Sequence, residues 1–268
     1  MRFLLCLFLV DFVVSDGVRN DPECGLRRTY GRDVRDGNFP EYPFIASILE
    51  FKPRKLDAEF MCAAALVSKR HLITAAHCFD DRPMNPRYYS VMTESQTTRA
   101  GLEFDIERID KFPLYREGSA YDDIALLTLK HEAHNNTIPV CLPTAGESYD
   151  QRLAYVLEYT PIYNGHMKVS MSRQIIAKRS DCEEVYQNTV SSKLLRGVSM
   201  EHLCTDKRSR QSHCIAYDGS PVVVNDKNNR LVLAGVATFR ENCTSQEFPG
   251  FFTKITPYLG WLERMMKP

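Results

Sequence analysis

The chain has 268 residues, of which 44% are apolar and 25% are charged. A chain of this length and composition can bury a full hydrophobic core and often forms one domain when it is all-β, which argues against disorder. Lys and Arg (34) balance Asp and Glu (34), so no overall charge draws the chain to nucleic acid or to an anionic membrane.

The first segment of the chain is short and apolar. Arg2 precedes an apolar run that extends to Val10, and Val13 and Ser15 suit a cleavage site near Ser15. We predict a signal peptide over residues 1–15 and therefore a secreted protein; the alternative is a buried first strand. The run is too short to span a membrane, so we expect no membrane span.

Short apolar runs bounded by turn residues recur along the chain. This rhythm predicts antiparallel strands. The runs cover residues 43–49, 63–67, 71–75, 124–129, 221–224, 231–238 and 250–255. Polar stretches such as residues 80–86 and 225–229 have the composition of loops. The pattern therefore indicates an all-β fold.

A short helix is predicted at the end of the chain. Thr256 can cap it and Pro257 can open it. Apolar side chains then recur at helical spacing, at Tyr258, Trp261, Leu262 and Met265. So short a helix is stable only when it docks on the rest of the protein.

The chain has nine cysteines, and removal of the signal peptide would take Cys6 and leave an even number. An even number in a secreted chain is typical of a disulfide framework, although counting cannot choose the pairs. Zinc is less favoured because no C-x-x-C or H-x-x-x-H spacing occurs. Two sequons, at Asn135 and Asn242, are compatible with surface glycosylation.

Three segments have the residues of a catalytic site. Residues 74–78 read T-A-A-H-C, residues 123–127 read D-I-A-L-L, and residues 214–221 read C-I-A-Y-D-G-S-P. They resemble, in the same order, the histidine, aspartate and nucleophile segments of the trypsin-like (S1) serine proteases. The resemblance covers roughly residues 29–268. It implies two six-stranded antiparallel β-barrels, a short C-terminal helix packed on the second barrel, and peptide hydrolysis of protein substrates.

By this resemblance His77, Asp123 and Asp218 occupy the positions of the catalytic triad. In the family the histidine takes the proton of a serine hydroxyl, and the buried aspartate orients the imidazole. Asp218 stands where that serine is expected. Attack by a carboxylate on a peptide would form an anhydride more labile than the amide, so we expect no acyl-enzyme chemistry. We also expect two flanking carboxylates to raise the pKa of His77.

Further departures concern activation and the oxyanion hole. Ala216 fills a glycine position whose backbone N–H serves the oxyanion hole in the family. Tyr217 replaces the aspartate that receives the new N-terminus after cleavage, and the chain after Arg28 begins with Thr29 in place of an apolar residue. The ion pair that forms after activation cleavage in the family therefore lacks both its usual N-terminal residue and its aspartate in this chain.

The specificity pocket departs as well. Ser212 lies at the expected base of the pocket in place of an acidic residue, so a basic substrate side chain lacks its counter-charge. The expected wall is formed by Thr238, Phe239 and Arg240, and Arg240 would narrow or close the pocket. Residues 207–210 form a basic loop beside it, which is either an exosite for an acidic partner or a solvated surface loop.

The resemblance also implies four disulfides. They are Cys24–Cys141, Cys62–Cys78, Cys182–Cys204 and Cys214–Cys243. The first would tether a propeptide-like segment, residues 16–28, to a peptidase-like domain over residues 29–268.

Three functional hypotheses follow. The first is a secreted, monomeric homologue that has lost peptide hydrolysis and acts by binding a protein. The second is an active endopeptidase in which Ser220 or a rearranged loop supplies the hydroxyl, although two residues of extended chain displace an atom by roughly 6 to 7 Å. The third is a cation site made by His77, Asp123 and Asp218, which is disfavoured because Asp123 should hold the imidazole. We expect no cofactor and no metal.

Overall fold

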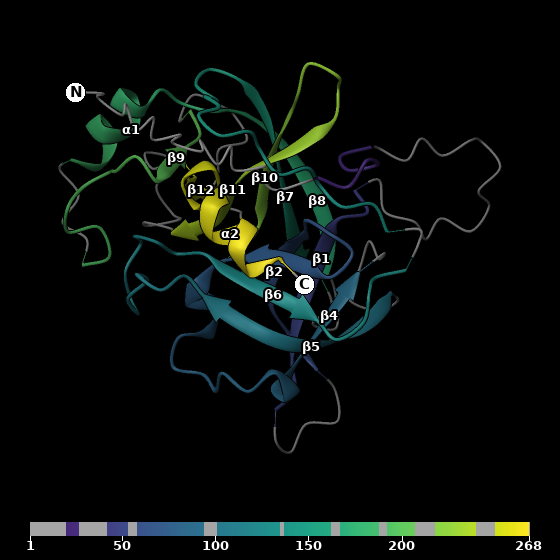
Figure 1. Ribbon diagram of the computed structural model, residues 1–268. Helices are drawn as coiled ribbons and strands as arrows, with labels where there is room; N and C mark the ends of the chain where they lie inside the picture. The colour runs from purple at the N-terminus through teal and green to yellow at the C-terminus, as the bar shows by residue number, and fades with distance from the viewer. Residues whose placement is uncertain are drawn as a thin grey trace, which may run out of the picture.

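The computed structural model describes residues 20–26, 42–52, 58–93, 101–134, 137–161, 167–187, 192–206, 218–239 and 250–267. These residues form two β-sheets that lie one above the other in Figure 1, with the C-terminal helix between them. The all-β prediction and the short C-terminal helix are confirmed. Among the described residues, no helix has the length and apolar character needed to cross a membrane.

The first sheet is a closed barrel of six antiparallel strands in the order β1-β2-β3-β6-β5-β4. The strands are β1 (Ile45–Glu50), β2 (Glu59–Leu66), β3 (His71–Thr74), β4 (Tyr89–Thr93), β5 (Leu102–Lys111) and β6 (Ala125–Leu129). Apolar side chains of β1, β2, β3 and β6 fill its interior and are almost fully buried. The predicted apolar runs at 43–49, 63–67, 71–75 and 124–129 overlap these strands, and β3 ends at Thr74, shortly before His77.

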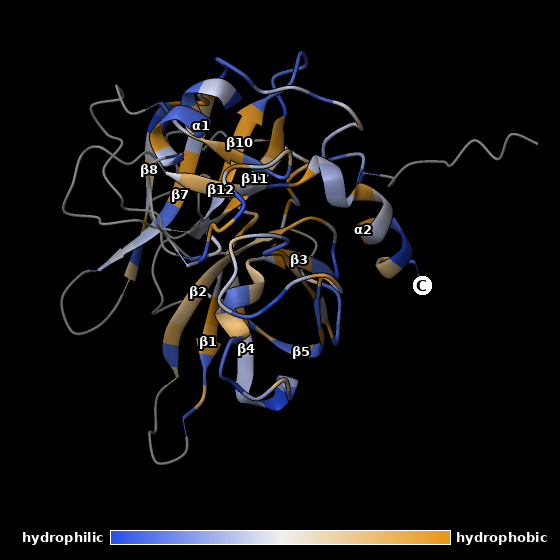
Figure 2. Ribbon diagram, turned by 90° about the vertical axis from the view of Figure 1, so that its left-hand side faces the viewer, coloured by the Kyte–Doolittle hydropathy of each residue, from blue (hydrophilic) through white to orange (hydrophobic). Residues whose placement is uncertain are grey.

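The second sheet also has six strands, in the order β8-β7-β10-β11-β12-β9. The strands are β7 (Leu153–Pro161), β8 (Met167–Ile175), β9 (His202–Cys204), β10 (Pro221–Asn225), β11 (Leu231–Phe239) and β12 (Phe251–Lys254). Apolar residues concentrate in the central strands, whereas α1 (Arg179–Tyr186) is mostly hydrophilic (Figure 2). Together the two sheets agree with a chymotrypsin-like double barrel.

The C-terminal helix begins differently from the prediction. Residues Thr256–Tyr258 form a 3₁₀ turn, no side chain caps it, and the helix α2 runs from Leu259 to Met265. The C-terminal segment also contacts the first barrel, because Phe112, which follows β5, packs edge-on against Tyr258 and Trp261 at centroid distances of 4.9 and 5.3 Å. The helix therefore docks between the two barrels.

Three of the four implied disulfides are present: Cys24–Cys141, Cys62–Cys78 and Cys182–Cys204. The Cys24 segment is also held by hydrogen bonds, because the Asn20 amide donates to the Leu142 carbonyl at 2.9 Å and accepts from the Leu142 N–H at 2.7 Å. Residues 20–26 are therefore anchored to the body by more than the disulfide.

Several predictions concern residues outside the described ranges. They are the signal peptide, Arg28 and Thr29, the Cys214–Cys243 bridge, the sequons at Asn135 and Asn242, the basic loop at 207–210, and Ser212, Ala216, Tyr217 and Arg240.

Candidate active site

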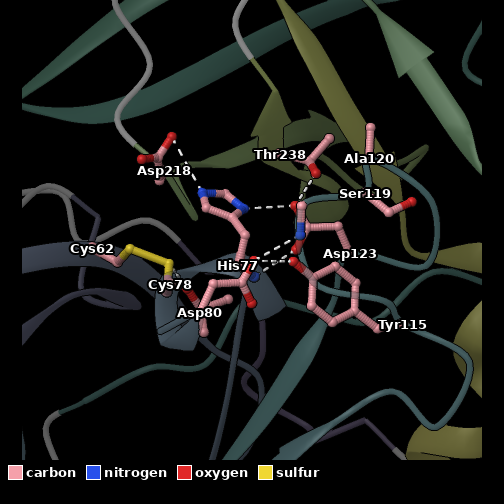
Figure 3. A network of polar contacts seen from close by, with 12 residues as sticks. Cys62, His77, Cys78, Asp80, Tyr115, Ser119, Ala120, Asp123, Asp218 and Thr238 are labelled. Atoms are coloured by element: carbon pink, nitrogen blue, oxygen red, sulfur yellow. Dashed lines mark hydrogen bonds and ion pairs between the residues drawn. A yellow bond between two sulfur atoms is a disulfide. The ribbon is translucent and has the colours of Figure 1, made fainter. Parts of the chain in front are cut away.

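His77 lies in a short 3₁₀ turn, Ala76–Phe79, directly after β3. The alanines on its N-terminal side are buried in the barrel, and Cys78 on the other side is bonded to Cys62 on β2. The residues on both sides of His77 are therefore held in place, and the imidazole side chain points toward the second barrel. Figure 3 shows this imidazole lying between two carboxylates.

Asp123 holds the inner side of the imidazole. Its side chain is 1% exposed, and its Oδ1 accepts the His77 backbone N–H at 2.8 Å. Its Oδ2 lies 2.6 Å from His77 Nδ1 and also accepts the Thr238 hydroxyl of β11. Because a carboxylate only accepts, Nδ1 carries the proton. The buried charge of Asp123 thus receives three donors from two barrels.

Asp218 approaches the imidazole from the solvent side. Its Oδ1 lies 3.4 Å from His77 Nε2, and its side chain is 40% exposed. The Ala63 N–H donates to the Asp218 carbonyl at 2.9 Å, and the next residue, Gly219, donates to the Ala237 carbonyl at 2.9 Å. The turn that carries Asp218 is therefore attached to β2 and β11, which directs the carboxylate toward His77.

The electrostatics of the site favour a charged imidazole. Burial by itself lowers the pKa of His77, but the charges and hydrogen bonds of Asp123 and Asp218 outweigh it and raise the pKa to about 10. The direction is the one expected from the sequence. A pKa of about 10 places a proton on both ring nitrogens at neutral pH.

Comparison of the sequence with known proteins shows the family of this chain. The model of the family described as Trypsin matches residues 30–262, which is most of the chain. The chain belongs to the trypsin family. Three similar proteins illustrate its range: the clotting factor G beta subunit of Tachypleus tridentatus (24% identical, over 92% of this chain and 83% of that protein), the venom peptide isomerase heavy chain of Agelenopsis aperta (25%, over 87% and 98%), and the CLIP domain-containing serine protease B14 of Anopheles gambiae (27%, over 92% and 75%).

Ser220, the alternative nucleophile in this trypsin-family chain, is buried. It precedes β10, is 0% exposed, and its Oγ has no hydrogen-bond partner among the described residues. The ion pair that His77 Nε2 makes is with Asp218. A hydroxyl that neither solvent nor the imidazole contacts cannot attack a bound peptide without a rearrangement of the turn.

Thr238, expected in the wall of the specificity pocket, is buried with its hydroxyl on Asp123. The remaining pocket positions, together with the side chain of Phe239, lie outside the described part of the structure. The described residues also contain no group of three or more His, Cys, Asp or Glu side chains arranged for a metal ion. The cation-site hypothesis for His77, Asp123 and Asp218 therefore has no support in the geometry.

Asp80 is a site residue that the sequence did not reveal. Its Oδ2 accepts the Tyr115 hydroxyl at 2.6 Å and the Gly118 N–H at 3.1 Å, and Lys111 Nζ lies 2.9 Å from its Oδ1. Burial acts to raise the pKa of Asp80, but these donors outweigh it and lower the pKa. Asp80 thereby attaches the loop after β5 next to His77 (Figure 3). In the sequence, Asp80 belongs to a polar stretch whose composition predicted only a loop.

A second missed cluster adjoins Asp123. Asp122 has φ of 57°, and its Oδ1 accepts the Tyr258 hydroxyl at 3.2 Å, while Glu201 Oε2 lies 3.3 Å from the same hydroxyl. One hydroxyl hydrogen thus serves two carboxylates. Burial and the negative charge of Glu201 raise the pKa of Asp122, although the Tyr258 hydrogen bond and the charge of Arg196 partly oppose this.

Asp122→Asn should therefore stabilise the protein at about pH 7.5, because it removes the repulsion between the carboxylates of Asp122 and Glu201. The gain should be only roughly 0.5 kcal/mol, since water screens these two charges. Because the pKa of Asp122 is raised, protonation of its carboxyl stabilises the fold at low pH. This stability is lost as the pH rises through the folded-state pKa of Asp122. At about pH 3, below the ordinary aspartate pKa of 3.8, the substitution should have little effect. Urea denaturation at both pH values measures this.

Asp105→Asn is the matched control, because Asp105 is 74% exposed and only 3.8 Å from Lys130. Its effect should be small at both pH values. An equal effect of Asp122→Asn at the two pH values would contradict the shared-proton interpretation.

Proposed function

We propose that this trypsin-family protein lacks peptidase activity and acts as a secreted, monomeric, protein-binding regulator of proteolysis. The observation that carries the proposal is the 3.4 Å contact between the Asp218 carboxylate and His77 Nε2. In a serine protease that nitrogen accepts the proton of the attacking hydroxyl. Here the Asp218 carboxylate occupies the place of that hydroxyl and keeps the imidazole protonated.

The chemistry of hydrolysis fails at two steps in this arrangement. The group nearest the imidazole has no proton to give and forms no stable acyl intermediate. The imidazole is already charged at neutral pH, so it cannot act as general base. The surfaces of the two barrels remain available to bind a protein, while His77, Asp123 and Asp218 keep the positions of a triad without its reaction.

The proposal of secretion rests on the cysteines and the N-terminal segment. Three disulfides are present, and disulfides persist in oxidising compartments. We further propose that residues 1–15 are removed, that residues 16–28 stay tethered through Cys24, and that Asn135 and Asn242 carry glycans. N-terminal sequencing and the mass lost on enzymatic deglycosylation test these points.

The competing function is an active endopeptidase, which whole-chain family membership favours. A fluorophosphonate probe that labels activated serines separates the two. The natural protein, before and after cleavage at Arg28, is expected to show no mass increase under conditions that label active trypsin completely.

Stoichiometric labelling of any serine that is lost in His77→Ala would overturn the proposal. Ser220→Ala then identifies the labelled residue, because a second nucleophile would survive that substitution. Casein hydrolysis by the natural protein would have the same consequence as labelling.

A further inference from the structure

A cavity of about 470 Å³ lies beside α1, β9 and the segment that joins β12 to the C-terminal helix. It shares no lining residue with the His77 site. Its walls are mainly apolar, and its size falls in the range of small-molecule sites in proteins. The apolar lining comes from Tyr149, Ile176, Ala177, Val198, Leu203 and Pro257.

Lys254 supplies a positive charge to this cavity. It is half-buried, and its Nζ lies 5.9 Å from the centroid of the Tyr149 ring. No carboxylate of the described residues forms an ion pair with it. The other lining cation, Arg179, is in contrast paired with Glu183 at 2.6 Å. A half-buried ammonium without a counter-ion favours an anion in the space next to it.

The acidic residues of the lining do not cancel this charge. Glu147 is paired with Arg152, with 2.8 Å between Oε1 of Glu147 and Nη1 of Arg152. Asp150 is exposed, so water and salt screen its carboxylate more than they screen Lys254. Asp150 therefore weakens the attraction for an anion but leaves its sign unchanged.

The side chain of Met200 adds an adaptable apolar surface. It lines the cavity although it is 68% exposed, and its sulfur contacts the Arg179 guanidinium. Methionine is flexible and accommodates apolar groups of different shapes. The cavity thus combines an apolar wall, a flexible apolar surface and one ammonium that no carboxylate in the described part of the chain pairs with.

We propose that this cavity binds a small organic molecule in which one carboxylate is attached to an apolar body. The carboxylate contacts Lys254, and the apolar body lies against Ile176, Val198 and Met200. The site is separate from the proposed function, so its presence or absence leaves the peptidase question untouched.

The probe is 4-phenylbutanoate, compared with 4-phenylbutanamide and 4-phenylbutylamine, which keep the ring and remove or reverse the charge. Titration calorimetry on the full-length protein is expected to show one saturable site with a Kd on the order of 1 mM for the carboxylate. The amide and the amine should bind about tenfold more weakly or worse. No saturable binding of the carboxylate, or equal binding of the amine, would overturn the proposal.

Two substitutions then locate the site. Lys254→Met should weaken carboxylate binding by about tenfold, whereas Asp150→Asn should tighten it about twofold by removing a like charge. Lys130→Met, on the first barrel, is the matched control and should leave binding unchanged. Undiminished binding in Lys254→Met would refute the assignment. If Lys254→Met does not fold, unchanged or weakened binding in the exposed variant Asp150→Asn would refute it.

Discussion

Replacement of Gly219 by alanine is expected to destabilise the fold by roughly 3 to 5 kcal/mol, from backbone strain and overpacking together. Gly219 has φ of +77°, which side-chain-bearing residues rarely adopt. A Cβ there would lie 2.2 Å from the Ala63 carbonyl oxygen and 2.3 Å from Thr74 Oγ1. The Thr74 hydroxyl donates to that same carbonyl at 2.7 Å, so neither neighbour can retreat without losing a buried hydrogen bond.

Gly118→Ala is the matched control. Gly118 has nearly the same φ, +74°, but no atom lies within 4 Å of its ideal Cβ position. Its substitution should cost only about 1 kcal/mol, the price of the backbone conformation alone. Urea denaturation of both variants measures the difference. Equal losses would show that the close approach of the Asp218 turn to β2 contributes nothing.

The second large effect concerns the protonation of His77. We expect an NMR titration to find its pKa at about 10. A raised pKa stabilises the folded state fully below the unfolded-state pKa, about 6.5, and this stability is lost as the pH rises through about 10. The contribution is on the order of a few kcal/mol. Stability should therefore fall between about pH 7 and pH 10.

Two substitutions separate the carboxylates. Asp123→Asn should lower the pKa of His77 by several units, because Asp123 is buried and contacts Nδ1 at 2.6 Å. Asp218→Asn should lower it less, because Asp218 is 40% exposed and 3.4 Å away. An ordinary or depressed pKa in the natural protein would contradict the contact of His77 with both carboxylates. An unchanged pKa in Asp218→Asn would mean that Asp218 points away from the imidazole in solution.

The apolar runs of the sequence correspond to the buried strands β1, β2, β3, β6, β10, β11 and β12. The strands β4, β5, β7, β8 and β9 lie outside the predicted runs. In β5 and β8, exposed side chains interrupt the buried ones and leave no continuous apolar run. Such strands are defined by their hydrogen-bonded neighbours rather than by their own composition. The helix α1 was missed for a related reason: only Cys182 and Tyr186 are buried, and the Cys182–Cys204 disulfide attaches it to β9.

The sequence by itself determined the resemblance to the trypsin family and gave His77, Asp123 and Asp218 as candidates for its triad positions, because short motifs carry them in a recognisable order. Only the tertiary structure decided that the Asp218 carboxylate faces His77, that Ser220 is buried, and that Asp80 and Glu201 support the site. These contacts join residues from distant parts of the chain. For Asp218, the turn bound to β2 and β11 sets where the side chain points. No local pattern determines such distances, since they depend on how the two barrels pack.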